Sequence, residues 1–143
     1  MRAWKERGVR RLASVAAELV HDRVAPPAAD VITYIPPDGD RSVRRGHHPA
    51  RDLAAALGAR WGMPVAGLLE RTRPVARQTH LSRAERRRNV RAAFRATHAP
   101  VPPRIVLVDD VYTTGATVDA GAAALRAAGA CEVVVVTLAR AIR

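Results

Sequence analysis

The feature that most constrains the fold is an apolar run that ends in two adjacent carboxylates and a turn rich in threonine. Ile105-Val106-Leu107-Val108 precedes Asp109 and Asp110, and Val111-Tyr112-Thr113-Thr114-Gly115-Ala116-Thr117 then leads into a helical pattern. Uninterrupted Val, Ile and Leu runs are typical of parallel strands covered on both faces. The segment therefore predicts an α/β protein with polar side chains at the carboxyl end of a buried strand, where open α/β sheets bind ligands.

The rest of the chain supplies the helices and strands that such a sheet requires. The patterns predict, in order, a helix at 4–24 within the first 25 residues, a strand at 30–35, a helix at 50–61, a weak strand at 65–69, a flexible loop at 71–80, a helix from 82 towards 94, a strand at 104–108, a turn at 109–115, a helix at 117–128 and a strand at 132–138. We find no internal repeat, low-complexity segment or second domain. We therefore expect a single domain over residues 1–143, with an open, mostly parallel sheet flanked by helices.

Composition limits the core and the cellular setting. Aromatic residues make up only 3% of the chain, so we expect a core of Val, Leu, Ile and Ala. The single cysteine, Cys131, excludes an intrachain disulfide and a multi-cysteine zinc site, and we expect its thiol to be buried. No stretch reaches the ~20 apolar residues needed to cross a bilayer, and Glu18, His21 and Asp22 interrupt the basic N-terminus. We therefore expect a cytoplasmic protein without a membrane span.

The net charge of +11 is concentrated in one part of the chain. The segment at 71–95 contains one acidic residue, Glu85. Its arginines are Arg71, Arg73, Arg77, Arg83, Arg86, Arg87, Arg88, Arg91 and Arg95. Such a surplus suits a nucleic acid or a substrate that carries several phosphates. A solvated basic face is the alternative interpretation.

The turn after the carboxylates has the chemistry of a phosphate site. A glycine lets the backbone fold closely around an anion, and the following helix N-terminus adds unpaired N–H donors and a favourable dipole. The candidate ligands of a ribose 5-phosphate are Thr113, Thr114, Gly115, Ala116 and Thr117. No P-loop, dinucleotide-binding or nucleophile-elbow pattern is present in the sequence. A strand that simply ends in a helix cap is the alternative.

The two carboxylates suggest a different task from that of the turn. Asp109 and Asp110 can accept hydrogen bonds from a vicinal diol, such as the ribose 2- and 3-hydroxyls. They can also stabilise Mg²⁺, mostly through water, because that ion keeps much of its hydration shell. We therefore treat both as candidate catalytic and metal-binding residues.

Two segments resemble a known family. Val106 to Thr117, read as V-L-V-D-D-V-Y-T-T-G-A-T, resembles the PRPP-binding signature of the type I phosphoribosyltransferases, where PRPP is phosphoribosyl diphosphate. Arg77 to Phe94 resembles the Q-T-x-L-S-x-x-x-R-x-x-N-V-x-x-x-F pattern of the ComF family of such proteins. The resemblance covers about Trp4 to Arg140 and implies the type I phosphoribosyltransferase fold.

The chain differs from the family pattern at three places. Many members carry a cysteine zinc module ahead of the transferase domain, and we expect this chain to lack it. His47-His48-Pro49 stands where members commonly read [FY]-N-Q, and His80 stands where glycine is common. The histidine pair has no third metal ligand nearby in sequence, so it is better interpreted as loop residues or diphosphate contacts than as a metal site.

The resemblance implies a reaction and roles for further residues. It implies Mg²⁺-dependent transfer of phosphoribose from PRPP to a nitrogen nucleophile, with release of diphosphate. Candidate diphosphate ligands are Arg41, Arg44 and Arg45, because guanidinium groups suit phosphate oxygens. Arg77 and His80 would belong to the flexible loop 71–80 that closes over the reaction.

Two other functions stay open at this point. The same loop could bind PRPP or another ribose 5-phosphate-containing nucleotide in a regulatory module without catalysis. The family name also suggests a nucleic-acid-binding accessory protein in DNA uptake, with the nucleic acid bound along Arg83–Arg95. The acceptor base or amine is unknown, and a homodimer is a further hypothesis.

Overall fold

The computed structural model describes residues 2–37, 48–72, 93–112 and 114–140. The elements in chain order are α1 (Arg2–His21), β1 (Val31–Tyr34), α3 (Pro49–Trp61), β2 (Leu69–Arg71), β3 (Phe94–Ala96), β4 (Arg104–Tyr112), α5 (Ala116–Ala127) and β5 (Glu132–Arg140). Among these residues, no helix is both long and apolar enough to cross a membrane.

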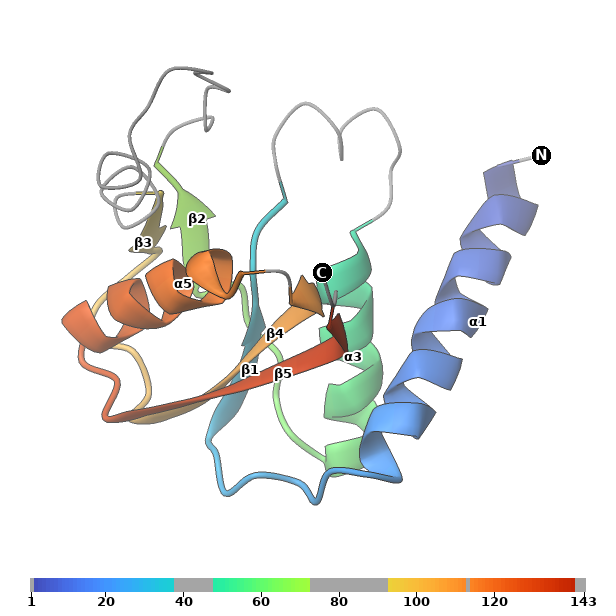
Figure 1. Cartoon of the computed structure of the whole chain (residues 1–143), viewed down its shortest axis with the longest axis horizontal. Coiled ribbons are helices and arrows are strands. Elements are labelled where there is room, and N and C mark those ends of the chain that lie inside the picture. Colours follow the sequence, from blue (N-terminus) through green and yellow to red (C-terminus); the bar gives the residue numbers. More distant parts are fainter. Residues whose placement is uncertain (1, 38–47, 73–92, 113, 141–143) are drawn as a thin grey trace.

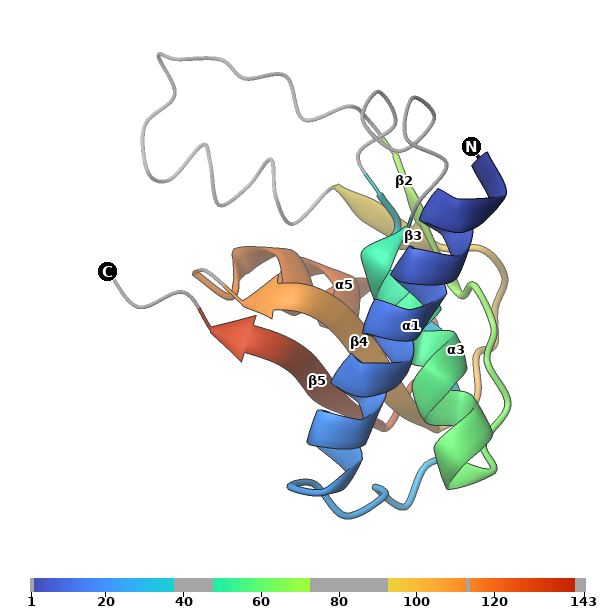
Figure 2. The same ribbon diagram turned by 90° about the vertical axis from the view of Figure 1, so that its right-hand side faces the viewer.

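The central sheet is parallel, with strand order β1-β4-β5 (Figure 1). Helices α1 and α3 cover one face and α5 covers the other, as the turned view of Figure 2 shows. Strands β2 and β3 form a separate antiparallel ribbon beside α5. The expected α/β class, with an open, mostly parallel sheet flanked by helices, is confirmed.

Alternating side chains of β4 build two aliphatic clusters, one on each face. Ile105 and Leu107 pack towards α5 and the ribbon, while Val106 and Val108 pack towards α1 and α3, and all four are fully buried. Helix α5 approaches the sheet closely because Gly121 carries no side chain. A Cβ there would lie 2.7 Å from Cδ1 of Ile35. The expected aliphatic core is therefore observed.

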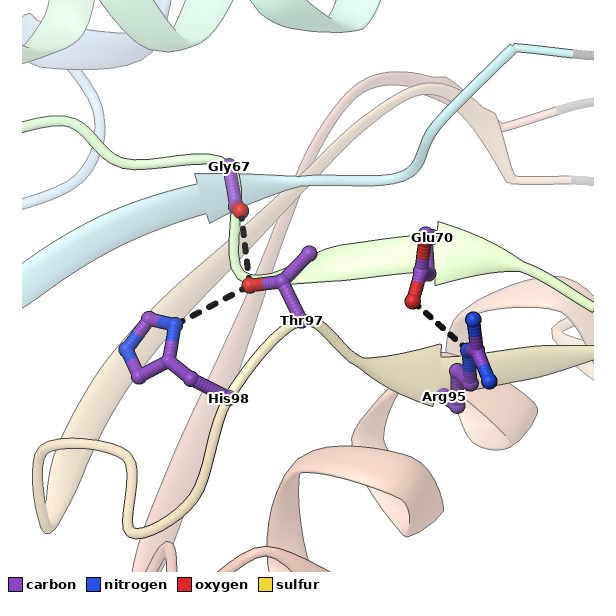
Figure 3. A network of polar contacts seen from close by, with 5 residues as sticks. All are labelled: Gly67, Glu70, Arg95, Thr97 and His98. Atoms are coloured by element: carbon purple, nitrogen blue, oxygen red, sulfur yellow. Dashed lines mark hydrogen bonds and ion pairs between the residues drawn. The ribbon is translucent and has the colours of Figure 1, made fainter.

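The β2–β3 ribbon contradicts the end of one predicted helix, whose residues 82–92 lie outside the described residues. The sequence pattern placed Phe94 on the inner face of a helix, whereas Phe94 begins β3 and pairs with Arg71. In Figure 3, Nε of Arg95 on β3 donates to Glu70 on β2 at 2.6 Å, and the Thr97 hydroxyl donates to the Gly67 carbonyl at 3.2 Å. Cross-strand pairing decides the conformation here, and a helical spacing of apolar residues does not reveal it.

Two other expectations also need correction. The Cys131 thiol, expected to be buried, is exposed, because Cys131 lies in the short connection between α5 and β5. The strand expected to end at Val108 continues to Tyr112. It continues because β5 also runs on to Arg140 beside it, with Asp109 opposite Thr137 and Tyr112 opposite Arg140. The predicted turn at 109–115 therefore begins only after Tyr112.

Candidate functional site

The candidate site lies at the carboxyl end of β4. Strand β1 ends opposite Val108, so Asp109 and Asp110 extend beyond it, and Asp109 is opposite Thr137 of β5. Side chains alternate along a strand. Asp109 consequently follows Leu107 on the α5 face, and Asp110 follows Val108 on the α3 face. The two adjacent carboxylates therefore belong to opposite faces of the sheet.

Asp109 is a buried carboxyl group with little charge compensation. The residue is 8% exposed, and Oδ1 accepts a hydrogen bond from the Asp110 backbone N–H at 2.9 Å. Burial, together with the neighbouring Asp110, raises the pKa of Asp109 from 3.8 to about 6, and the nearby Arg71 opposes this increase. Strongly raised carboxyl pKa values are common at functional sites. Asp109 is thus suited to a cation or to ligand hydroxyl donors.

Arg71 is a site residue that the sequence analysis did not single out. It ends β2, and its Nε donates to the Pro36 carbonyl just after β1 at 3.0 Å. Its guanidinium carbon lies 4.8 Å from the centre of the Phe94 ring, and its charge acts on Asp109. Arg71 therefore connects the ribbon, the end of β1 and the buried carboxylate. The sequence places it only in an arginine-rich segment, because these contacts come from parts of the chain far apart.

His48, which the sequence analysis interpreted as a loop residue or a diphosphate contact, lies on the α3 face. It is the N-cap of α3, and its Nδ1 accepts a hydrogen bond from the Arg51 backbone N–H at 3.2 Å. Its ring meets Tyr34 edge-on, with ring centres 5.2 Å apart. Burial lowers the pKa of His48, and the carboxylates of Asp52 and Asp110 oppose that change. The Nε2 atom is buried and has no hydrogen-bond partner among the described residues.

The turn after β4 leads directly into the N-terminus of α5. Gly115 is the N-cap residue with φ of +78°, a left-handed conformation that favours glycine, and it supplies no side-chain cap. The Ala116 N–H donates to Thr114 Oγ1 at 3.4 Å. Thr117 lies in the first helical turn. The N-terminal donors and two of the expected threonines are thus close to the end of β4, as a phosphate site requires.

Several predicted site residues lie outside the described residues. They are Arg41, Arg44, Arg45, Arg77, His80 and Thr113. Of the segment proposed to contact nucleic acid, Arg83 to Arg95, only the last three residues are described. Arg95 is in a strand instead of the expected helix, and it is ion-paired with Glu70.

The described residues do not form a complete metal site by themselves. Among them, no three His, Cys, Asp or Glu side chains come together closely enough to hold a metal ion. Mg²⁺, however, is commonly held by one or two carboxylates together with water and phosphate oxygens. Asp109 and Asp110 fit that arrangement, because a buried carboxyl with a raised pKa gains from a nearby cation.

Comparisons with known proteins agree with this geometry. The model of the phosphoribosyl transferase domain matches residues 6–143. The DNA utilization protein YhgH of Salmonella typhi is 37% identical over 118 residues, which cover 80% of this chain and 51% of that protein. Competence protein F of Haemophilus influenzae is 35% identical, with 96% of this chain and 62% of that protein covered. The chain spans about half the length of the first of these curated relatives.

Solved structures show the same fold. A structure described as the allosteric regulatory enzyme of purine biosynthesis superposes with a TM-score of 0.59 at 28% identity, covering 88% of this chain and 25% of that one. The glutamine PRPP amidotransferase of B. subtilis, in complex with ADP and GMP, gives a TM-score of 0.58 at 27% identity, covering 88% and 26%. Both similarities concern one part of a larger protein.

Proposed function

Because the chain belongs to the phosphoribosyl transferase domain family, with relatives among the competence proteins, we propose that it binds PRPP with Mg²⁺ and transfers phosphoribose to a nitrogen nucleophile. The observation that carries this proposal is the pair Asp109–Asp110 on a strand that leads, through the left-handed Gly115, into the N-terminus of α5. Diphosphate is the leaving group.

Each part of the ligand has a matching part of the site in this proposal. Asp109 and Asp110 accept the ribose hydroxyls and hold Mg²⁺ mostly through water, and Mg²⁺ when bound supplies positive charge to the diphosphate. The 5-phosphate is bound by Thr113, Thr114, Gly115, Ala116 and Thr117. Arg41, Arg44 and Arg45 remain the proposed diphosphate ligands, and Arg77 and His80 the proposed residues of the closing loop.

Catalysis in this scheme rests on positioning and charge. Cleavage of the bond to diphosphate gives the ribose ring an oxocarbenium-like transition state, so no covalent enzyme intermediate is needed. The chain holds the ribose against the nucleophile, excludes water and neutralises the departing charge.

The test is a calorimetric titration of PRPP with Mg²⁺, followed by an assay of diphosphate release with a panel of nitrogen bases. We expect binding, and we expect Asp110→Asn to weaken it about tenfold or more, since hydrogen bonds to charged groups are strong. Glu132→Gln, which changes an exposed carboxylate at the opposite end of the sheet, is the matched control and should bind normally. Absence of PRPP binding would refute the proposal, whereas binding without turnover would favour a regulatory module.

A role in DNA uptake is a second candidate, favoured by the relatives' names and by the net charge of +11. Such binding would be electrostatic, so the affinity for duplex DNA should fall steeply with salt. The double variant Arg87→Ala/Arg91→Ala should bind DNA more weakly and reduce that salt dependence. Unchanged DNA retention by this variant would count against the candidate.

A further inference from the structure

The two edges of the central sheet differ in how the chain covers them. At the β1 edge, the segment after α3 pairs with the strand. The Ile32 N–H donates to the Pro64 carbonyl at 2.8 Å, and the Ala66 N–H donates to the Ile32 carbonyl at 3.0 Å. At the other edge, β5 is paired with β4 alone within the described part of the chain, and it has nine residues against the four of β1. A long edge strand is a template for a further strand.

The sequence of β5 lacks the features that commonly protect such an edge. Proteins block exposed edges with charged side chains or proline within the strand. Between Glu132 and Arg140, β5 reads V-V-V-V-T-L-A, with no charge, no proline and no glycine. Val135 and Leu138, on opposite faces of the strand, are 39% and 44% exposed. The strand is therefore suited to pairing with another strand.

Helix α1 adds an apolar surface beside this edge. It packs against α3 and β5 on the face of the sheet that α3 also covers (Figure 2). Ala16 and Val20 pack into the core below, and Glu18 is ion-paired with Arg60 of α3. The side of α1 turned away from α3, towards the β5 edge, carries exposed apolar residues at helical spacing, which are Leu12, Val15 and Leu19. The apolar surface thus includes both the strand and the helix.

The charges at the two ends of β5 favour a second copy of this chain as the partner. Glu132 is the first residue of the strand and Arg140 the last. When two such strands pair antiparallel about a two-fold axis at Val136, position 132 of each copy is opposite position 140 of the other. Opposite charges at facing positions stabilise a strand pair, and all positions between them are uncharged. Within one chain the two positions are separated by the whole strand, so their charges complement each other only between copies.

The same two-fold axis brings the two α1 helices together. An axis normal to the sheet keeps α1 of both copies on one face, on either side of the joined strands. The exposed apolar side of each α1 then faces the partner copy. Interfaces in which both copies use the same surface are the commonest in homo-oligomers. One arrangement therefore covers the strand edge and the apolar side of the helix.

We propose that β5 and the outer side of α1 form a homodimer interface, in which the two β5 strands pair antiparallel and join the two sheets into one. The proposal goes beyond the proposed function and does not depend on PRPP binding. The competing interpretation is a monomer with an exposed sheet edge.

Sedimentation equilibrium over a concentration series tests for the dimer. Moderate salt is added, because two chains of net charge +11 repel each other. We expect wild type to dimerise and Leu138→Lys to weaken the dimer about tenfold or more, since an unpaired charge in an interface is costly. Val65→Lys, at an exposed apolar position on the β1 edge, is the matched control and should dimerise normally. A wild type that stays monomeric overturns the proposal, and so does equal dimerisation of Leu138→Lys and wild type.

A charge exchange tests the pairing itself and leaves every apolar residue in place. Glu132→Lys and Arg140→Glu should each weaken the dimer about threefold or more, because like charges then face each other. The double variant Glu132→Lys/Arg140→Glu should return to nearly the wild-type affinity, because opposite charges face each other again. Circular dichroism checks that each variant is folded. A double variant as weak as the single variants overturns the antiparallel pairing of β5.

Discussion

The ring of Tyr112 lies directly over the α-carbon of Gly115. A Cβ at position 115 would overlap the Tyr112 hydroxyl and lie 2.7 Å from Cζ of the ring. The last residue of β4 thus covers the left-handed residue that opens α5. Glycine is required here both by its φ of +78° and by the covering ring.

We predict that Gly115→Ala is more destabilising than backbone strain alone explains. Gly62 provides the control, because its φ is +63° and nothing lies within 4 Å of a Cβ built there. Gly62→Ala should cost about 1 kcal/mol. Gly115→Ala should cost about 1 kcal/mol more, because the Tyr112 ring must move. Urea denaturation measures both.

A Tyr112→Ala background isolates that second contribution. Gly115→Ala introduced there should cost no more than Gly62→Ala does. If the additional cost persists without the ring, the overlap is not its cause.

Asp109 should make the ligand-free protein less stable as the pH rises. Folding raises its pKa from 3.8 to about 6, so the folded chain holds this proton more tightly than the unfolded chain. The stabilisation is fully present below about pH 4 and is lost as the pH rises through about 6. The free energy of unfolding of Asp109→Asn should therefore exceed that of wild type at pH 8 by about 1 kcal/mol or more. This difference should shrink towards pH 4. A stability difference that stays constant over this range in thermal melts would contradict the prediction.

Arg71 should not be replaceable by lysine. Arg71→Lys keeps the charge near Asp109 but loses the planar group over Phe94 and the Nε–H bond to Pro36, so it should cost about 1–2 kcal/mol. Arg95→Lys, at an exposed ion pair in the same ribbon, should cost less than about 1 kcal/mol. Urea denaturation measures the unfolding free energy of both variants. If Arg71→Lys and Arg95→Lys lose equal amounts, the contacts of Arg71 to Pro36 and Phe94 contribute no additional stability.

Gly121 sets the distance between α5 and the sheet. A Cβ there would lie 2.7 Å from Ile35 Cδ1 and 3.3 Å from Leu107 Cδ2. Overpacking of this kind costs about 1–3 kcal/mol, partly offset by about 1 kcal/mol from better helix propensity. Gly121→Ala should therefore lower the unfolding free energy. Ile35→Val removes Cδ1 and should lower the unfolding free energy of wild type by about 1 kcal/mol. In the Gly121→Ala background the same substitution should cost little or nothing.

The sequence predicted the parts of the fold whose signal is local. The apolar run before Asp109, the glycine-containing turn and the helical pattern after it correctly predicted β4 and α5. Ligand binding at that end of the sheet stays a prediction. The α1 and α3 patterns were also sufficient, with α1 ending at His21 instead of Val24 and α3 starting at Pro49. In each case the hydrophobic period alone indicates the element.

The parts that were missed depend on contacts between distant segments. Phe94 is in a strand because β2 pairs with it, and Asp109 to Tyr112 stay extended because β5 continues beside them. Arg71 was not singled out, and the proximity of His48 to Asp110 was not foreseen, because Asp109 and Asp110 are far from both residues in sequence. Neither residue type nor spacing encodes such proximity.

The division of Asp109 and Asp110 between the two faces of the sheet has a consequence for how such a site can change over time. Each carboxylate meets a separately packed layer, with Arg71 on one side and His48 on the other. Substitutions in the α3 layer can thus alter selectivity for one end of a ligand without repacking the layer that would hold the other end. In the proposed site, two consecutive residues of one strand would thereby provide two halves that can change independently.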